Sequence, residues 1–412
     1  MSRVELFDGV VPRVLVPRSL LTRPERFGGR TVGDCLAGDL ILRAGRVTGL
    51  RDCESEPERV VMSRLTETHV HLDKCHTIGR MPRVGGDLAD AIAAQRSDKA
   101  NWSVADLRRR MTRGMHELRD AGCGAVRSHV DWGDDPDPAA VPPAWDVLEE
   151  VAVDFGPGIV LQRAALTSIA ALSDAAYADG CAARIARDGG VLGAFVFDQP
   201  ERRAGIANAF RAADRHGLAL DFHVDEGLAP GLDGLEMIAD AALGMRFEGP
   251  VLCGHACSLA NLSGAPLRRI ADKLARAGIS VAVLPWTNLY LQGRGDGTPD
   301  RRGLTRVHEL RAAGVNVVVG TDNVGDAFCP LGAHAPTRTL ALAAVAAHLD
   351  PPFADHLQMI TTAAAQALGL PPVHIDGAAV DDLLAFEATS TADLLGRAPA
   401  PRPLSHITGA RP

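Results

Sequence analysis

The sequence predicts an α/β protein: a (β/α)8 barrel of the TIM type with a small β-sandwich formed by the N- and C-terminal segments. Three observations support this fold. Eight short apolar runs recur along the middle of the chain, and helix-like segments that end in Gly precede most of them. Short β-prone pieces lie outside these repeats at both ends of the 412 residues, a length that accommodates one large domain and a smaller unit.

The eight runs have the continuous apolar character of strands that are buried on both faces. Their predicted ranges are 64–72, 124–131, 158–166, 191–198, 218–226, 250–257, 280–288 and 316–323. Eight strand–helix repeats of this kind are typical of a (β/α)8 barrel.

Four of the intervening segments show the helical repeat clearly. Their apolar residues recur every three or four positions, and a Gly follows each as a C-cap. The segments read VADLRRRMTRGMHELRDAG, GIANAFRAADRHG, PLRRIADKLARAG and TRVHELRAAG.

The remaining β-prone pieces are LFDGVVPRVLV and DLILRAGRVTGL near the start and DDLLAFEATSTADLL near the end. We expect them to pair with one another outside the barrel. The predicted domains are therefore a small β-sandwich of residues 1–62 plus 372–412 and a barrel of residues 63–371.

Composition excludes several classes of function. The formal net charge is −8, and no cluster of Lys and Arg forms the basic patch that nucleic-acid binding needs. The eight Cys are scattered without a C-x-x-C pair, which indicates reduced thiols and a cytoplasmic location. The N-terminus lacks a signal sequence, and no run approaches about eighteen consecutive apolar residues, so we expect no membrane association.

Strong polar side chains stand at the ends of five predicted strands, where a barrel of this type carries its active site. They are His69 and His71, His129, His223 with Glu226, His255, and Asp322. Each alone fits a solvated strand end. Together they favour a site, because unpaired imidazoles and carboxylates are costly at buried strand ends.

Three imidazoles and one carboxylate, from His69, His71, His223 and Asp322, make a ligand set that suits Zn(II) or Fe(II) with a position left open for water. Such an ion makes hydroxide available near pH 7. Glu226 is close to His223 in the sequence and can carry protons between this water and a leaving nitrogen. His255 can hold or polarise the hydroxide.

The motifs ETHVHLDK, VRSHVD, FHVDE, GHACSL, NLYLQGR and GTDNVGDAFCPLG occur in this order. Over roughly residues 60 to 335, the chain resembles the cytosine deaminase branch of the metal-dependent amidohydrolase superfamily. The resemblance implies a distorted (β/α)8 barrel with a small β-sandwich and one catalytic metal, zinc or iron. It matches His69, His71, His223 and Asp322 to the metal ligands, Glu226 to the proton-shuttling glutamate and His255 to the water-orienting histidine.

The scarcity of Lys supports a single metal. Binuclear relatives bridge two ions with a carboxylated Lys on a middle strand, and this chain has no Lys between residues 100 and 272. Lys74 follows the first strand, so we interpret it as a second-shell or surface residue. His129 is interpreted either as packing behind the site or as a substrate contact. His76 and His334 are assigned a structural or surface role.

Three substrate-contact positions depart from the family pattern. A family Gln after the third strand is replaced within the run Leu166, Thr167 and Ser168; the carboxylate after the metal Asp is Asn323; and the stacking Trp is Phe328. Cytosine itself is therefore not the expected substrate, because a site built to hydrogen-bond one ring edge loses affinity when that partner changes.

Two further residues complete the expected pocket. Leu88 occupies a lid position that the family uses to cover the ring. Trp286, beside the seventh strand, either lines the pocket or packs in the core. Phe328 keeps an aromatic face, so we expect a planar ring such as isocytosine, a pterin, an amino-triazine or creatinine.

The sequence thus predicts a hydrolase that acts on carbon–nitrogen bonds: a hydrolytic deaminase of a cyclic amidine or amino-substituted N-heterocycle that releases ammonia. One alternative is a hydrolase of a cyclic amide or N-alkylamino-triazine on the same metal. Another is a non-catalytic ligand-binding barrel. Such barrels often assemble, so a homo-oligomer is left open.

Overall fold

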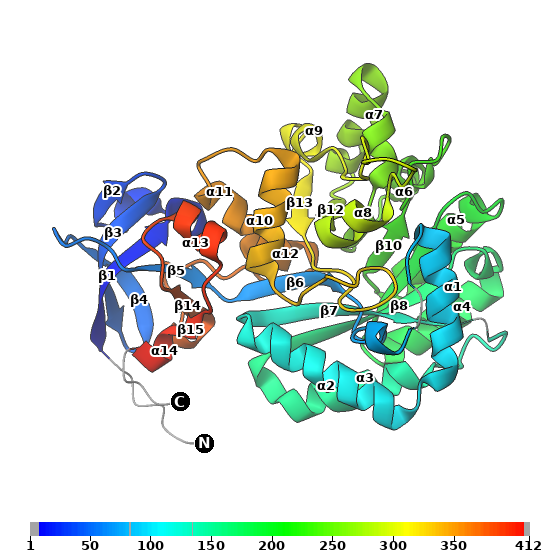
Figure 1. Ribbon diagram of the computed structural model, residues 1–412, viewed down its shortest axis with the longest axis horizontal. Coiled ribbons are helices and arrows are strands. Elements are labelled where there is room, and N and C mark those ends of the chain that lie inside the picture. Colours follow the sequence, from blue (N-terminus) through cyan, green and yellow to red (C-terminus); the bar gives the residue numbers. More distant parts are fainter. Residues whose placement is uncertain (1–7, 82–83, 134, 408–412) are drawn as a thin grey trace.

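A computed structural model of the chain describes residues 8–81, 84–133 and 135–407. It confirms the predicted fold. An eight-stranded parallel sheet alternates with helices, and a separate sheet contains strands from both ends of the chain. Figure 1 shows this second sheet in blue and red beside the barrel.

The barrel strands follow one another in chain order around the sheet, from β6 to β13. They are β6 (Leu65–Val70), β7 (Cys123–Asp131), β8 (Val160–Ser168), β9 (Val191–Val196), β10 (Leu220–Val224), β11 (Val251–His255), β12 (Ser280–Val283) and β13 (Asn316–Val319). The first and last strands meet at an isolated parallel bridge between Val70 and Asp322. We call this junction the barrel seam.

Helices surround the barrel strands. They are α1 (Leu88–Asp98), α2 (Val104–Asp120), α3 (Pro143–Phe155), α4 (Ala175–Arg187), α5 (Arg202–His216), α6 (Gly234–Met245), α7 (Gly264–Arg276), α8 (Pro285–Leu291), α9 (Val307–Ala312), α10 (Pro336–Ala347), α11 (Ala354–Leu357) and α12 (Thr362–Ala367). Helix α8 lies at the end of the barrel that carries His255. Helix α7 shows why they dock: Leu267, Ile270, Ala271 and Leu274 recur every three or four residues and are buried. The predicted terminating glycines, including Gly217 after α5, have positive φ.

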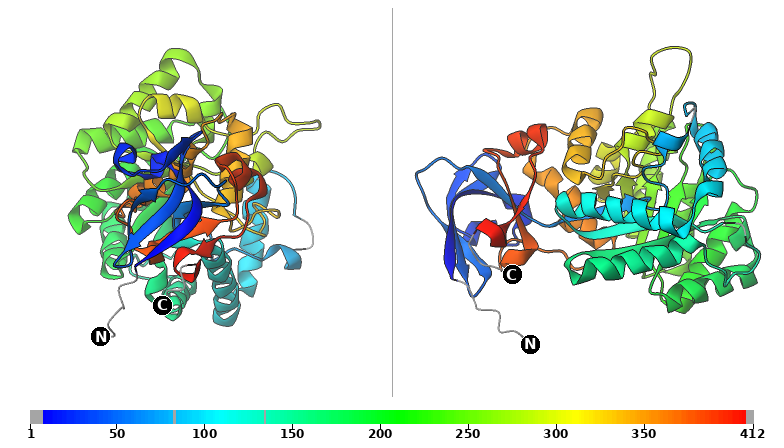
Figure 2. Two further views of the ribbon diagram at one scale, coloured as in Figure 1. Left: turned by 90° about the vertical axis from the view of Figure 1, so that its left-hand side faces the viewer. Right: turned by 60° about the horizontal axis from the view of Figure 1, so that its bottom comes forward.

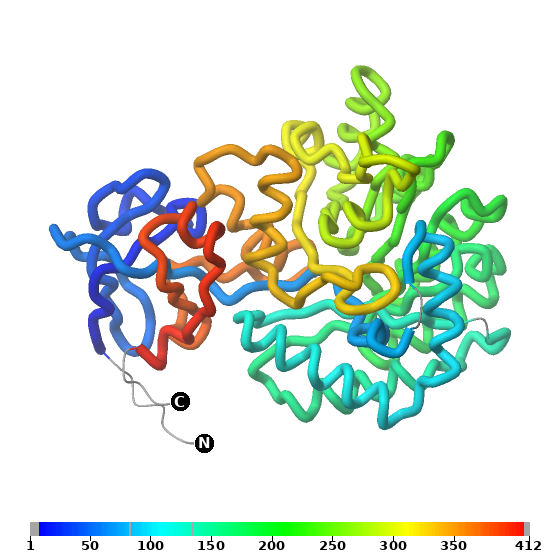
Figure 3. Tube along the Cα trace, in the orientation of Figure 1, coloured from blue at the N-terminus to red at the C-terminus, as the bar shows by residue number. Residues whose placement is uncertain are grey.

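The second sheet joins the two ends of the chain. Its strands are β1 (Gly9–Pro17), β2 (Arg30–Val32), β3 (Cys35–Arg43), β4 (Arg46–Arg51), β5 (Arg59–Ser63), β14 (Leu383–Phe386) and β15 (Arg402–Pro403), with α13 (Thr391–Arg397) and α14 (Leu404–Ile407) beside them. C-terminal β14 pairs antiparallel with β5, which leads directly into β6. Figures 2 and 3 show this sheet at one end of the barrel. The domain boundaries at residues 62 and 372 stay a prediction.

Several strands end earlier than predicted because the chain turns where it enters the site. The seventh predicted strand, 280–288, stops at Val283, and Pro285 begins helix α8 at its first position. The backbone reverses at His255 and at Asp322, whose φ angles are 69° and 58°. Within the described residues, the helices are all too short or too polar to cross a lipid bilayer.

Candidate metal centre and active site

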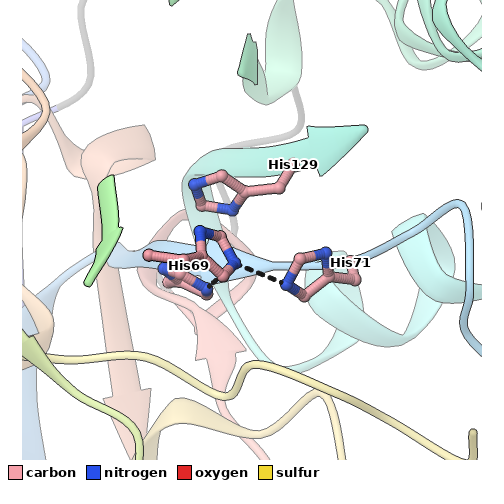
Figure 4. A group of neighbouring side chains, drawn as sticks. His69, His71 and His129 are labelled. Carbon is pink, nitrogen blue, oxygen red and sulfur yellow. Dashed lines mark hydrogen bonds between the residues drawn. The ribbon is translucent and has the colours of Figure 1, made fainter. Parts of the chain in front are cut away.

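Four of the predicted site residues meet at one end of the barrel. His69 lies in β6, His71 follows this strand, His223 lies in β10 and Asp322 follows β13. All four are at most 5% exposed. Figure 4 shows the rings of His69 and His71 turned toward a common point, with His129 beside them.

The ligand atoms of these four residues are closely spaced. The Nε2 atom of His223 lies 3.1 Å from Nε2 of His69 and 3.0 Å from Nε2 of His71. Asp322 Oδ1 lies 3.6 Å from Nε2 of His69 and 3.4 Å from Nε2 of His71. Four ligands about 2.0–2.1 Å from a tetrahedral zinc ion are separated by about 3.3–3.4 Å, so this spacing suits a metal.

The protonation of the cluster also suits a cation. Burial lowers the pKa of the His69, His71 and His223 imidazoles well below the usual value, so the rings are neutral and their lone pairs are free to bind. Both carboxylate oxygens of Asp322 are buried without a hydrogen-bond partner among the described residues. A buried carboxylate in this condition needs a counter-charge.

His129 lies beside this cluster, and one of its ring nitrogens is within 4.8 Å of ligand atoms of His69, His71 and His223. Its ring centroid is 4.1 Å from that of His69, and its Nε2 lies 3.0 Å from an oxygen of Asp221. The other oxygen of Asp221 accepts a hydrogen bond of 2.9 Å from Arg127. Both roles expected for His129, packing beside the ligands and contact with the substrate, stay predictions.

Glu226 and His255 lie beside the cluster. Glu226 Oε1 is 3.5 Å from Nδ1 of His255, and Asn288 donates its side-chain amide to the same nitrogen at 2.9 Å. Burial lowers the pKa of His255 to about 4, so its ring is neutral. Because Nδ1 accepts from Asn288, the single proton of the ring sits on Nε2. Sequence reasoning missed this role of Asn288, although the residue lies within the NLYLQGR motif.

Burial, reinforced by the nearby Asp322 carboxylate, raises the pKa of Glu226 well above the usual value. Its Oε1 has no hydrogen-bond partner among the described residues. A carboxyl group that is buried, unpaired and close to a metal-ligating cluster is suited to hold a proton and release it.

The position of His69 is set by residues that the sequence analysis did not use. Glu67, fully buried, accepts hydrogen bonds of 3.0 Å from the backbone N–H groups of His69 and Thr321, across the barrel seam. Burial raises the pKa of Glu67 to about 7. Gly254 and Gly320 lie against the His69 side chain, and a Cβ atom at either would approach it to 2.9 Å.

Lys74 and Phe328 form one wall near the cluster. The Lys74 ammonium lies 5.0 Å from the centre of the Phe328 ring and 2.8 Å from an oxygen of Asp131. Burial alone would lower the pKa of Lys74, but the carboxylates of Asp131 and Asp73 raise it above its usual value. Lys74 is only 5% exposed, so it is a buried cation rather than a surface residue. Leu88 packs in the same small apolar cluster as Phe328.

The other predicted substrate-contact residues lie in different surroundings. Asn323 donates its side-chain amide to Asp326 at 2.7 Å, and burial raises the pKa of Asp326 to about 7. Ser168 ends β8 and is partly buried. Trp286 belongs to α8, is partly buried and donates its indole N–H to Thr339 of α10 at 3.1 Å, and its place in the pocket stays a prediction.

Comparison with known proteins shows the family to which this chain is similar. Residues 86–387 match the model of a family described as the amidohydrolase family. A pterin deaminase from Rhizobium rhizogenes is 32% identical over 411 residues, an alignment that covers 96% of this chain and 91% of that protein.

Two solved structures share the fold. The 5-methylcytosine deaminase from Klebsiella pneumoniae, liganded with 5-fluorocytosine, superimposes with a TM-score of 0.78 at 24% identity, covering 95% of this chain and 94% of that one. The N-isopropylammelide isopropylaminohydrolase from Burkholderia multivorans superimposes with a TM-score of 0.69 at 20% identity, covering 94% and 95%.

Proposed function

Because the chain belongs to the amidohydrolase family, we propose that it is a metal-dependent hydrolytic deaminase of an amino-substituted N-heterocycle. The observation that carries this proposal is that the Nε2 atoms of His69 and His71 both lie 3.0–3.6 Å from Nε2 of His223 and from Oδ1 of Asp322, with Glu226 and His255 beside them. In this proposal those four residues hold one divalent ion, zinc or iron.

A divalent ion bound there supplies Lewis acidity, which lowers the pKa of a water molecule toward neutrality. Glu226 accepts a proton from the water at its unpaired Oε1 and delivers it to the ring nitrogen next to the reacting carbon. His255 donates a hydrogen bond from Nε2 to the attacking oxygen and orients it. An oxygen of Asp322 accepts the second proton and passes it to the amino group as the C–N bond breaks, so water and the amino-heterocycle give an oxo-heterocycle and ammonia.

The residues around the cluster fit a planar, polar ring. Phe328 offers its face, and the buried ammonium of Lys74 offers a donor to an oxo group of the ring. Asn323 donates to Asp326, which also accepts from the backbone N–H groups of Phe328 and Cys329, so Asp326 holds the loop that presents Phe328. A 2-amino-4-oxo ring of the pterin kind matches this set, and the pterin deaminase relative makes it the first compound to test.

The test is ammonia release by chain loaded with zinc or iron. The compounds are pterin, 6-substituted pterins, isocytosine, cytosine, 5-methylcytosine, creatinine and amino-triazines. We expect release from pterin or a substituted pterin and little from cytosine. Release of an alkylamine from an N-alkylamino-triazine instead would support the alternative hydrolase.

The matched control is Glu226→Gln, which keeps the shape of the side chain and removes its proton transfer. Because Glu226 is not among the proposed metal ligands, this variant should bind one metal and the same ring compound but lose turnover by about 10²- to 10⁴-fold. If the wild-type chain binds metal and ring yet releases neither ammonia nor amine, the deaminase proposal fails and a binding barrel remains.

A further inference from the structure

A second group of metal-ligating side chains lies outside the candidate active site. Glu117 comes from α2, His76 from the loop after β6 and His334 from the loop between β13 and α10. One oxygen of Glu117 lies 2.8 Å from Nδ1 of His334 and 3.1 Å from Nε2 of His76. The three ligand atoms all lie within 4.8 Å of one another. We call these residues the second triad.

The three residues of the second triad line a cavity of about 580 Å³. Arg113 and parts of the loop at residues 324–333 also line it. The side chain of His334 is fully buried and that of His76 is 11% exposed. Nε2 of His76 contacts the Glu117 carboxylate, whereas Nε2 of His334, whose Nδ1 faces that carboxylate, is buried without a hydrogen-bond partner among the described residues. The two imidazole nitrogens that meet the one carboxylate oxygen, at 2.8 and 3.1 Å, bring three ligand atoms close enough together for a bound cation.

The protonation of the triad suits a cation. Burial lowers the pKa of His334, which leaves a neutral ring with a free lone pair. Burial alone would raise the pKa of Glu117, but its contacts with His334 and His76 hold it well below the usual range, so the carboxylate is charged. Two imidazoles and one carboxylate are a recurrent ligand set of zinc sites that keep a fourth position open.

The backbone holds the triad in position. His76 has a φ of 60°, in the region that non-glycine residues rarely adopt, and its N–H donates to the carbonyl of Val324 at 3.0 Å. Two residues further, the N–H of Ile78 donates to Gly325 at 2.9 Å. On the other side, a Cβ atom at Gly114 would come within 3.1 Å of the His334 ring, so that glycine leaves the ring its space.

We propose that His76, Glu117 and His334 form a second site for a divalent transition metal, separate from the one in the barrel. Zinc and its borderline neighbours, such as cobalt, fit the two nitrogens and one oxygen. An ion there cross-links helix α2 to the two loops that leave β6 and β13. Strand β6 carries His69 and leads to His71, and β13 leads to Asp322. An ion at the second triad therefore holds the loops that surround the proposed metal site of the barrel.

The test is a cobalt titration of chain that has been loaded with one equivalent of zinc, which the four-ligand barrel site takes first, and desalted. Cobalt bound to nitrogen and oxygen ligands absorbs visible light, so binding is read without any turnover. We expect the wild type to bind one more equivalent of cobalt than the His76→Gln variant, and its unfolding midpoint to rise with added metal where that of the variant does not. Glu117→Gln is a second variant that removes the charged ligand.

The matched control is His216→Gln. The Nε2 atom of His216 also lies 3.0 Å from a carboxylate oxygen, that of Asp179, but no second histidine among the described residues completes a triad there. This control should bind as much cobalt as the wild type. Equal binding by the wild type and both triad variants would overturn the proposal, and this outcome would leave the deaminase proposal untouched.

Discussion

Replacing Gly254 with Ala tests how tightly the barrel holds His69. A Cβ atom at position 254 would lie 2.9 Å from Cε1 and 3.1 Å from Nδ1 of the imidazole. Ordinary carbon contacts begin near about 3.5 Å, so the new methyl overlaps the ring by about 0.6 Å. The ring cannot retreat freely, because Gly320 marks an equally close approach to the Cβ of His69.

Overpacking of this kind costs about 1–3 kcal/mol. If the whole cost falls on the metal-loaded geometry, it raises the dissociation constant of the metal by about 5- to 150-fold. The assay is competition for zinc with a chelating dye, with the unfolding midpoint of the metal-free chain measured in parallel. The control is Gly244→Ala on an exposed part of α6, where no atom lies within 4 Å of the new Cβ. A Gly254→Ala chain that binds zinc as tightly as the wild type would refute the reasoning.

Three further predictions concern residues around the site and on the surface. Lys74→Met should lower kcat/KM by about 10- to 150-fold, because the substrate loses a charged hydrogen bond of about 1.5–3 kcal/mol. The control Lys99→Met removes the second Lys paired with Asp131 and should change kcat/KM far less, because the Lys99 ammonium lies over Trp102. Equal effects of the two substitutions would contradict a role for Lys74 in the pocket. Asn288→Leu should lower kcat by about 5- to 150-fold and raise KM less, because His255 loses the donor that fixes its tautomer. Steady-state kinetics measures both constants, and a change in KM alone would argue against this role of Asn288. Contacts with Arg269 and Lys273 lower the pKa of Glu236 to about 2, so this carboxylate contributes stability above its usual pKa of 4.5 and loses it as the pH falls toward 2. The difference in urea midpoint between wild type and Glu236→Gln should therefore shrink from pH 5 to pH 3, and a constant difference would show that the ion pair does not act.

The barrel could be predicted because its signals are local. Continuous apolar runs and glycines after amphipathic segments mark each repeat without knowledge of its neighbours. The strand ends were less accurate, because the chain bends at His255 and Asp322 to aim side chains inward, and a proline rather than a change in hydrophobicity ends the seventh strand. Such bends depend on packing between strands that are distant in the sequence.

The proposed metal ligands were accessible from the sequence because each stands at the end of an apolar strand. The residues that surround them were not, because their contacts arise between loops. Lys74 meets Phe328, and His76 meets His334, across more than 250 residues of chain. No spacing rule connects such positions, so the burial of Lys74 and the second triad became visible only in the folded chain.

The barrel seam has a consequence for the order of assembly. The bridge there joins Val70 to Asp322, and Asp322 also donates its backbone N–H to His69 at 2.8 Å. Closing so long a loop carries a large entropic cost and is slow among folding events. The candidate metal centre spans this late contact, so a nascent or truncated chain that ends before residue 322 lacks one of the four proposed ligands. Binding of the metal with all four ligands would then indicate that the barrel has closed. When the ion is removed, the backbone amides at the seam should be the first to exchange their hydrogens.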